Sequence, residues 1–163
     1  MMKRSHGLLS LEQHRKLGKT LFNHVWDLME KKTKTAEEDA EMIRDVHASR
    51  FHWGEVGTPG NLAVGEWQIT RVYSLIGMPE SALYHAKRSL AYVKAGGEGF
   101  EDFHLPSAYE GLARAYAAAG EEKNARRYLA MAERLTKRIT GTDERNTISE
   151  QIASVPIHNK KAV

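Results

Sequence analysis

Apolar residues recur every three or four positions along most of this chain, the spacing that places them on one face of an α-helix. The first series consists of Leu17, Leu21, Val25 and Leu28. Ser10 precedes it, and Gln13 follows Ser10 by three residues, which is the spacing of a capping box at a helix N-terminus. We therefore predict a first helix over residues 10–32.

A second series begins after Thr35 and Glu38, which repeat the capping spacing. One stripe of this helix comprises Ala36, Ala40, Ile43, His47 and Phe51. The series ends at a Gly-Thr-Pro-Gly turn, because glycine and proline at residues 57–60 do not continue a helix. We expect the two helices to form a hairpin over residues 10–57.

Glycine and proline divide the rest of the chain into further helices. Pro79 and Pro106 suit the first turn of a helix, Gly77 and Gly120 suit the position just after one, and Asn61 is a suitable N-cap. The predicted helices cover residues 61–75, 79–95, 106–120, 121–139 and 142–155. No segment alternates between polar and apolar residues over the length of a strand, so the predicted fold class is all-α.

An internal repeat links the predicted helices. Tyr73, Gly77 and Ala82 recur 43 positions later as Tyr116, Gly120 and Ala125. In the second copy, large and small residues follow the spacing Tyr109, Leu112, Ala113, Tyr116, Gly120, Ala125, Leu129 and Ala132. This spacing resembles the tetratricopeptide repeat, in which small residues on the second helix let the two helices pack closely.

The first copy departs from that pattern, since Glu66 stands where an aromatic residue is expected. The usual period of the family is about 34 residues, and a glycine-rich insertion at residues 96–104 accounts for the longer offset. Phe100 and Phe103 in the insertion are expected to fold back onto the helices.

The resemblance implies a single domain over residues 1–163, folded as an α-α superhelix of tetratricopeptide-like hairpins. Residues 10–57 would form a divergent capping hairpin, 61–96 the first repeat, 106–140 the second repeat and 142–155 a C-terminal helix. Short strings such as His47-Ala48-Ser49 and Ala108-Tyr109-Glu110 also resemble a group of bacterial helical-repeat proteins without a known activity.

In tetratricopeptide arrays the first helix of each hairpin lines a concave groove. Carrying the register of that family over from Tyr109 places Trp67, Arg71, Glu110 and Arg114 in the groove. Arginine offers a planar fork for carboxylates and tryptophan a flat apolar surface. We therefore expect a protein-protein interaction or scaffold module that binds an acidic peptide segment or a small anionic ligand.

Two further residues are candidates for the ligand site. His47 lies on the apolar stripe of the second helix, and Trp53 lies at the end of that helix, where it would cover the groove mouth or anchor the following turn. The simpler alternative is that Glu110 and Arg114, one turn apart, pair with each other and that Arg71 joins them.

The chain contains eight histidines, which suggest a metal-binding protein or an enzyme as the alternative function. His47, His52, His85 and His104 are the candidates, with Asp102 or Glu110. However, no pair of them has the three- or four-residue spacing of ligands on one helix face. We expect neither a bound metal, a cofactor nor a catalytic residue.

Composition and charge bear on the partners and the cellular location of the protein. The net charge of +3 comes without a basic patch interleaved with aromatic residues, so we expect no nucleic-acid partner. The absence of cysteine and of a long apolar run favours a cytoplasmic protein outside the membrane. Self-association through the long first helix is a further hypothesis.

Overall fold

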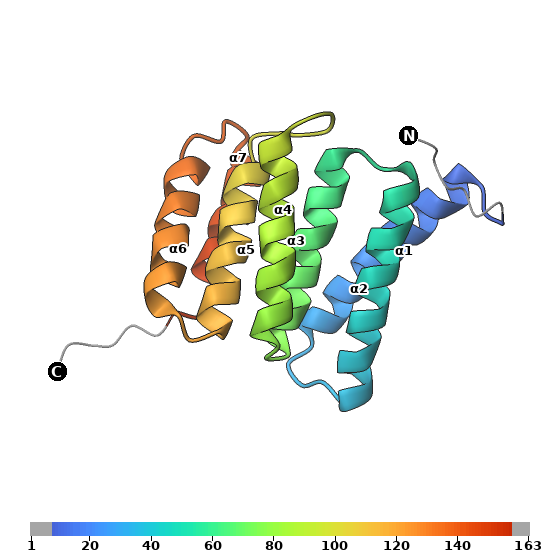
Figure 1. The fold of residues 1–163 in the computed structure, drawn as a ribbon, viewed down its shortest axis with the longest axis horizontal. Helices are drawn as coiled ribbons and strands as arrows, with labels where there is room; N and C mark the ends of the chain where they lie inside the picture. The colour runs from blue at the N-terminus through green and yellow to red at the C-terminus, as the bar shows by residue number, and fades with distance from the viewer. Residues whose placement is uncertain (1–7, 158–163) are drawn as a thin grey trace.

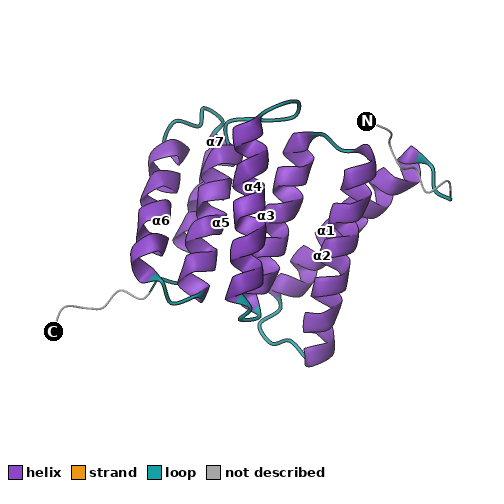
Figure 2. Ribbon diagram, in the orientation of Figure 1, coloured by secondary structure: helices purple, strands orange, loops and turns teal. Residues whose placement is uncertain are grey.

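The computed structural model describes residues 8–157, which fold into α-helices joined by short connections. In chain order the helices are α1 (Leu11–Glu30), α2 (Ala36–Val56), α3 (Pro59–Leu75), α4 (Pro79–Ala95), α5 (His104–Ala118), α6 (Glu122–Thr136) and α7 (Thr142–Ala153). No strand occurs among the described residues (Figure 2), which confirms the predicted all-α class. None of these helices is long and apolar enough to cross a membrane.

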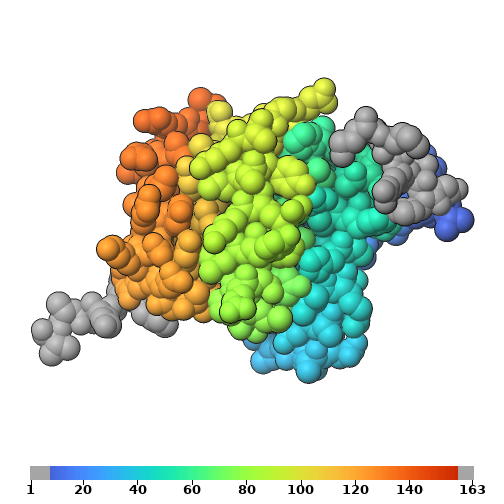
Figure 3. Space-filling view, in the orientation of Figure 1, coloured from blue at the N-terminus to red at the C-terminus, as the bar shows by residue number. Residues whose placement is uncertain are grey.

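Consecutive helices pair as hairpins: α1 with α2, α3 with α4, and α5 with α6. The hairpins stand side by side in chain order (Figure 1). Their second helices form one face of the molecule, with α4 between α2 and α6 (Figure 3). On the opposite side, α7 lies behind α5 and α6 and contacts both of them (Figure 1).

The capping boxes predicted at Ser10 and Thr35 are both present. However, α3 begins at Pro59, because its N-cap is Thr58 rather than the predicted Asn61. The Thr58 hydroxyl accepts a hydrogen bond from the backbone N–H of Asn61 (3.4 Å), and Asn61 Oδ1 accepts one from the backbone N–H of Thr58 (3.0 Å). The cap prediction at Asn61 was wrong because that side chain is the reciprocal partner in the box.

The fifth helix also begins earlier than predicted. It starts at His104, so Pro106 occupies the third position instead of the first. Proline is tolerated there because the first four N–H groups of a helix have no partner within the helix. The last helix, α7, starts at Thr142 with Gly141 as its N-cap, since the Gly141 carbonyl accepts a hydrogen bond from the Arg145 N–H (2.9 Å).

The 43-residue repeat corresponds to one turn that is built twice. After α3, the N–H of the residue that follows Gly77 donates to the Tyr73 carbonyl (2.9 Å). After α5, the N–H of the residue that follows Gly120 donates to the Tyr116 carbonyl (2.9 Å). The two glycines have φ values of +76° and +73°, the left-handed conformation that ends a helix in a Schellman motif. The repeat is therefore structural.

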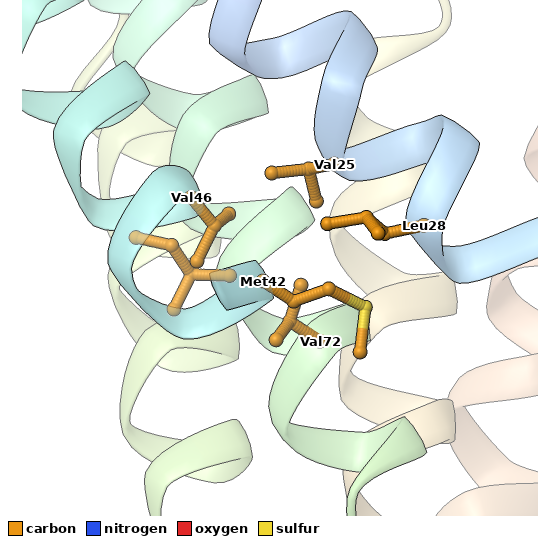
Figure 4. Close-up of a cluster of buried hydrophobic side chains, with 6 residues drawn as sticks. Val25, Leu28, Met42, Val46 and Val72 are labelled. Carbon is orange, nitrogen blue, oxygen red and sulfur yellow. The ribbon is translucent and has the colours of Figure 1, made fainter. Parts of the chain in front are cut away.

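The apolar core differs from one end of the array to the other. Large side chains join α1, α2 and α3: Val25, Leu28, Met42, Val46, Ile69 and Val72 (Figure 4). The junction of α4 with α5 packs mainly through small ones: Ala82, Ala86, Leu112 and Ala115. A third cluster holds α7 against α6: Ala132, Ile139, Ile148 and Ile152.

The insertion between α4 and α5 folds back onto the start of α3, as expected from its aromatic residues. The Gly60 N–H donates to the Glu98 carbonyl (3.3 Å). A Cβ atom on Gly60 would overlap the carbonyl oxygen of Gly99, so this approach of two backbones requires glycine. The Phe103 ring stacks on the His104 ring, with centroids 4.1 Å apart. The insertion thereby becomes a wall beside α3 and α5.

Truncation of Met42 tests the large-residue core. Met42 is fully buried, so Met42→Ala leaves a cavity and is expected to lower the free energy of unfolding by about 3 kcal/mol. For a chain of this size, the melting temperature should fall by about 10 °C. Met78→Ala is the matched control, because Met78 is 45 % exposed. Equal effects of the two substitutions in urea denaturation would contradict this assignment of the core.

Candidate functional site

A buried carboxylate, Glu110 on α5, lies at the centre of the predicted groove residues. Trp67 Nε1 on α3 donates to its Oε2 at 2.7 Å. Arg71 Nη1 and Arg114 Nε donate to its Oε1 at 3.3 Å and 2.8 Å. All four residues placed together by the repeat register are thus in direct contact, and the pairing of Glu110 with both arginines is present.

The Arg71 guanidinium lies between two indole rings. Its Cζ atom is 5.0 Å from the ring centroid of Trp26 on α1 and 5.3 Å from that of Trp67. The two rings are themselves 5.8 Å apart. Stacking on both faces holds the guanidinium in one orientation. Trp26 is not among the predicted ligand residues, and the structure adds its contact with Arg71.

A cavity of about 390 Å³ adjoins the two arginines at the C-terminal ends of α3 and α5. It is lined by Met29, Arg71, Ser74, Leu75, Arg114, Ala118, Ser154 and Pro156. The Ser74 hydroxyl oxygen is buried and makes no hydrogen bond within the described residues. We call this space the arginine cavity. It combines two cationic side chains with hydroxyl groups.

The charges around Glu110 do not balance. Two arginines share one carboxylate, which leaves one positive charge on the wall of the arginine cavity. Burial, followed by repulsion from Arg114, lowers the pKa of Arg71 to about 10, so the group stays protonated at neutral pH at an electrostatic cost. An anion in the cavity would reduce that cost.

A second cavity of about 330 Å³ lies at the N-terminal ends of the same helices. It is lined by Ala63, Val64, Trp67, Ser89, Phe103, His104, Ser107, Asp143, Glu144, Thr147, Ile148 and Gln151. Aromatic and aliphatic groups dominate the lining, and the buried Gln151 Oε1 has no hydrogen-bond partner within the described residues. We call this space the apolar cavity. Such a lining is typical of sites that bind small molecules or side chains.

The last helix lines the apolar cavity, and the residues that follow it, Ser154 and Pro156, line the arginine cavity. Arg114 Nη2 donates to the Gln151 carbonyl at 3.1 Å and to Ser154 Oγ at 2.7 Å, so a cation lies at the C-terminal end of α7. This end carries the negative pole of the helix dipole. Arg114 therefore fixes the position of α7 while it also holds Glu110.

The other two candidate ligand residues lie elsewhere. The Nε2 atom of His47 is 2.9 Å from the hydroxyl of Tyr73, and its ring faces His85 on α4, so His47 does not touch Glu110. Trp53 packs against Gly18 on α1 and lines a hollow of about 270 Å³ between α1, α2 and α3. The structure thus brings together four of the six predicted ligand residues.

A second buried carboxylate, Glu66 on α3, was not predicted as a site. His85 Nδ1 lies 2.6 Å from its Oε2, and Arg50 Nε and Arg88 Nε lie 3.1 Å and 3.2 Å from its Oε1. Burial alone would raise the pKa of Glu66, but the His85 hydrogen bond and the two guanidinium charges outweigh it and lower the pKa. The only sequence signal was an acidic residue at a position where the repeat pattern expects an aromatic one.

The four histidines considered as metal ligands do not converge. His47 and His85 share one cluster, whereas His52 pairs with His14 across α1 and α2, with their Nδ1 atoms 2.9 Å apart. His104 Nδ1 accepts a hydrogen bond from the backbone N–H of Glu101 at 2.9 Å. These contacts assign the histidines to interfaces between helices and to the insertion.

Acidification is expected to destabilise the fold. Burial lowers the pKa of His47, His52 and His104 in the folded chain, so as pH falls below about 6.5 the unfolded chain takes up protons first. His24 opposes this, since a hydrogen bond to Glu41 raises its pKa. Urea unfolding at pH 7.5 and 5.5 should give a lower free energy of unfolding at pH 5.5. In His24→Gln the loss of stability between pH 7.5 and 5.5 should be larger than in the wild type. A free energy of unfolding of the wild type that is unchanged or higher at pH 5.5 would contradict the prediction.

Comparison with known proteins assigns no family to this arrangement. No protein-family model matches the chain, no curated protein matches it, and no solved structure matches it.

Proposed function

We propose that this chain is a binding module built on a tetratricopeptide-like array. Its ligand would be a peptide segment of a partner protein that carries an acidic group next to an apolar side chain. The acidic group would enter the arginine cavity and the apolar side chain the apolar cavity. The lack of cysteine supports a cytoplasmic setting for this activity.

The positive charge left over beside Glu110 is the observation that carries the proposal. Arg71 is only 15 % exposed and already stacked between two indole rings, so its guanidinium is oriented before any ligand arrives. A preorganised fork loses little side-chain entropy when it binds a carboxylate. The Ser74 hydroxyl on the same cavity wall has no hydrogen-bond partner within residues 8–157, so it supplies a further donor for an anion.

The apolar cavity supports a peptide rather than an isolated anion. Trp67 lines the apolar cavity and contacts Arg71, which lines the arginine cavity, so these two touching side chains connect the two cavities. Asp143 and Glu144 at the start of α7 also line this cavity, and they would repel a second acidic group. The charges thus favour one direction of the segment, with its acidic group toward Arg71.

The register of the hairpins supports the tetratricopeptide-like assignment. Trp67 and Arg71 occupy the same positions in the first copy as Glu110 and Arg114 in the second. Equivalent positions of neighbouring repeats meet on the side lined by the first helices, where members of that family bind peptides.

A peptide-library selection tests the proposed ligand. The purified chain should enrich segments in which Asp or Glu lies within a few residues of Leu, Met or Phe. Arg71→Lys preserves the charge beside Glu110 but removes the fork and the stacking, so the best peptide should bind at least about tenfold more weakly by calorimetry. Arg134→Ala, an exposed arginine on α6, is the matched control and should bind normally. Selection without acidic enrichment, or equal binding by Arg71→Lys, would exclude the proposal.

Replacing Glu110 separates binding from stability. Glu110→Gln removes the competing charge, so the freed guanidinium groups should bind the acidic peptide about tenfold more tightly. The same change leaves both arginines without their carboxylate and should lower the free energy of unfolding by about 3 kcal/mol. Calorimetry below the melting transition and urea denaturation measure the two effects. Weaker or unchanged peptide binding would mean that the arginines serve the fold alone.

A further inference from the structure

A cluster of three potential metal ligands joins α1 to α2, away from Glu110. His24 Nε2 lies 2.9 Å from Glu41 Oε1 and 3.6 Å from Asp45 Oδ2. Glu41 and Asp45 are one turn apart on α2, so both carboxylates face the same imidazole on α1. It is the one such group among the described residues in which three ligand atoms all lie within 4.8 Å of one another.

These separations suit a small metal ion. In a tetrahedral site with metal–ligand bonds of about 2.0–2.1 Å, neighbouring ligand atoms lie about 3.3 Å apart. The two distances from His24 Nε2, 2.9 Å and 3.6 Å, fall on either side of that value. These two of the three ligand–ligand distances therefore need to change by only a few tenths of an ångström.

The electrostatics of the cluster favours a cation. Within residues 8–157, His24 is the ion-pair partner of both Glu41 and Asp45. Two carboxylates that face one imidazole form a location that attracts a divalent cation.

We propose that His24, Glu41 and Asp45 form a site for one divalent first-row transition-metal ion of the Zn²⁺ type. The imidazole nitrogen selects against Mg²⁺ and Ca²⁺, which prefer oxygen ligands only. The side chains are 42 %, 38 % and 21 % exposed, so water can fill the remaining position. The bound ion links α1 to α2 and thereby stabilises the first hairpin.

Calorimetric titration of the full chain, without an affinity tag, with Zn²⁺ tests the site. The expected result is one equivalent bound per chain, with affinity reduced at least about tenfold by His24→Ala and by Asp45→Asn. Glu37→Gln is the matched control, because Glu37 is an exposed acid on the same helix outside the cluster. If the wild-type chain binds no Zn²⁺ with this stoichiometry, or if His24→Ala binds as tightly, the site does not exist.

Two further readouts make the test independent of folding. Zn²⁺ should raise the melting temperature of the wild-type chain and of Glu37→Gln but not of His24→Ala, whose metal-free circular dichroism should match the wild type. Co²⁺ should give the visible absorption bands of a nitrogen–oxygen site in the wild type and in Glu37→Gln but not in His24→Ala. A larger thermal shift with Mg²⁺ or Ca²⁺ than with Zn²⁺ would overturn the assigned class of metal.

Discussion

The hydrogen bonds to the Glu110 carboxylate govern the arrangement of α3, α5 and α7. A carboxylate with no exposed surface is strongly destabilising unless cations and donors surround it. Trp67 and Arg71 supply these groups from α3, and Arg114 supplies one from the same helix as Glu110. Arg114 also donates to the Gln151 carbonyl and the Ser154 hydroxyl at the end of α7, so one charge-neutralising group fixes the spacing of three helices. The cavities on either side follow from that spacing.

The neighbouring junction uses the same chemistry with different residues. Glu66 on α3 accepts hydrogen bonds from Arg50 of α2 and from His85 and Arg88 of α4. The core between α4 and α5 is apolar and contains three alanines, Ala82, Ala86 and Ala115, together with larger side chains such as Leu112. Apolar contacts are not directional, so they do not by themselves fix the register of the helices. If one helix slid along its neighbour, each buried carboxylate would lose its ion pairs with the arginines, which would be strongly destabilising. The two glutamates therefore specify how successive hairpins stack, and the alanines let them approach closely.

Local signals predicted the helices well because caps, prolines and left-handed glycines act within a few residues. Two helices begin earlier than predicted: α3 is capped by Thr58, and α5 starts at His104. At both places a residue before the predicted start can also cap or extend the helix. The repeat register also placed Trp67 and Glu110 in the same groove, since periodicity carries information between hairpins. By contrast, His24 meets Glu41 across a helix interface that no spacing encodes. No spacing encodes the contact between Arg50 and Glu66 either. The position of α7 depends on Arg114, which donates hydrogen bonds both to Glu110 and to residues at the end of α7.

The place of α7 also constrains how an array of this kind can change its length. Ile148 and Ile152 cover the apolar edge of α6, on which the next hairpin of a longer array would have to stack. A hairpin added after residue 136 by tandem duplication would have to displace α7. Arg114 would then lose its hydrogen bonds to Gln151 and Ser154. Lengthening by duplication is therefore strongly disfavoured at this end, and divergence of the existing copies, as between Trp67 and Glu110, is the easier route to a new binding surface.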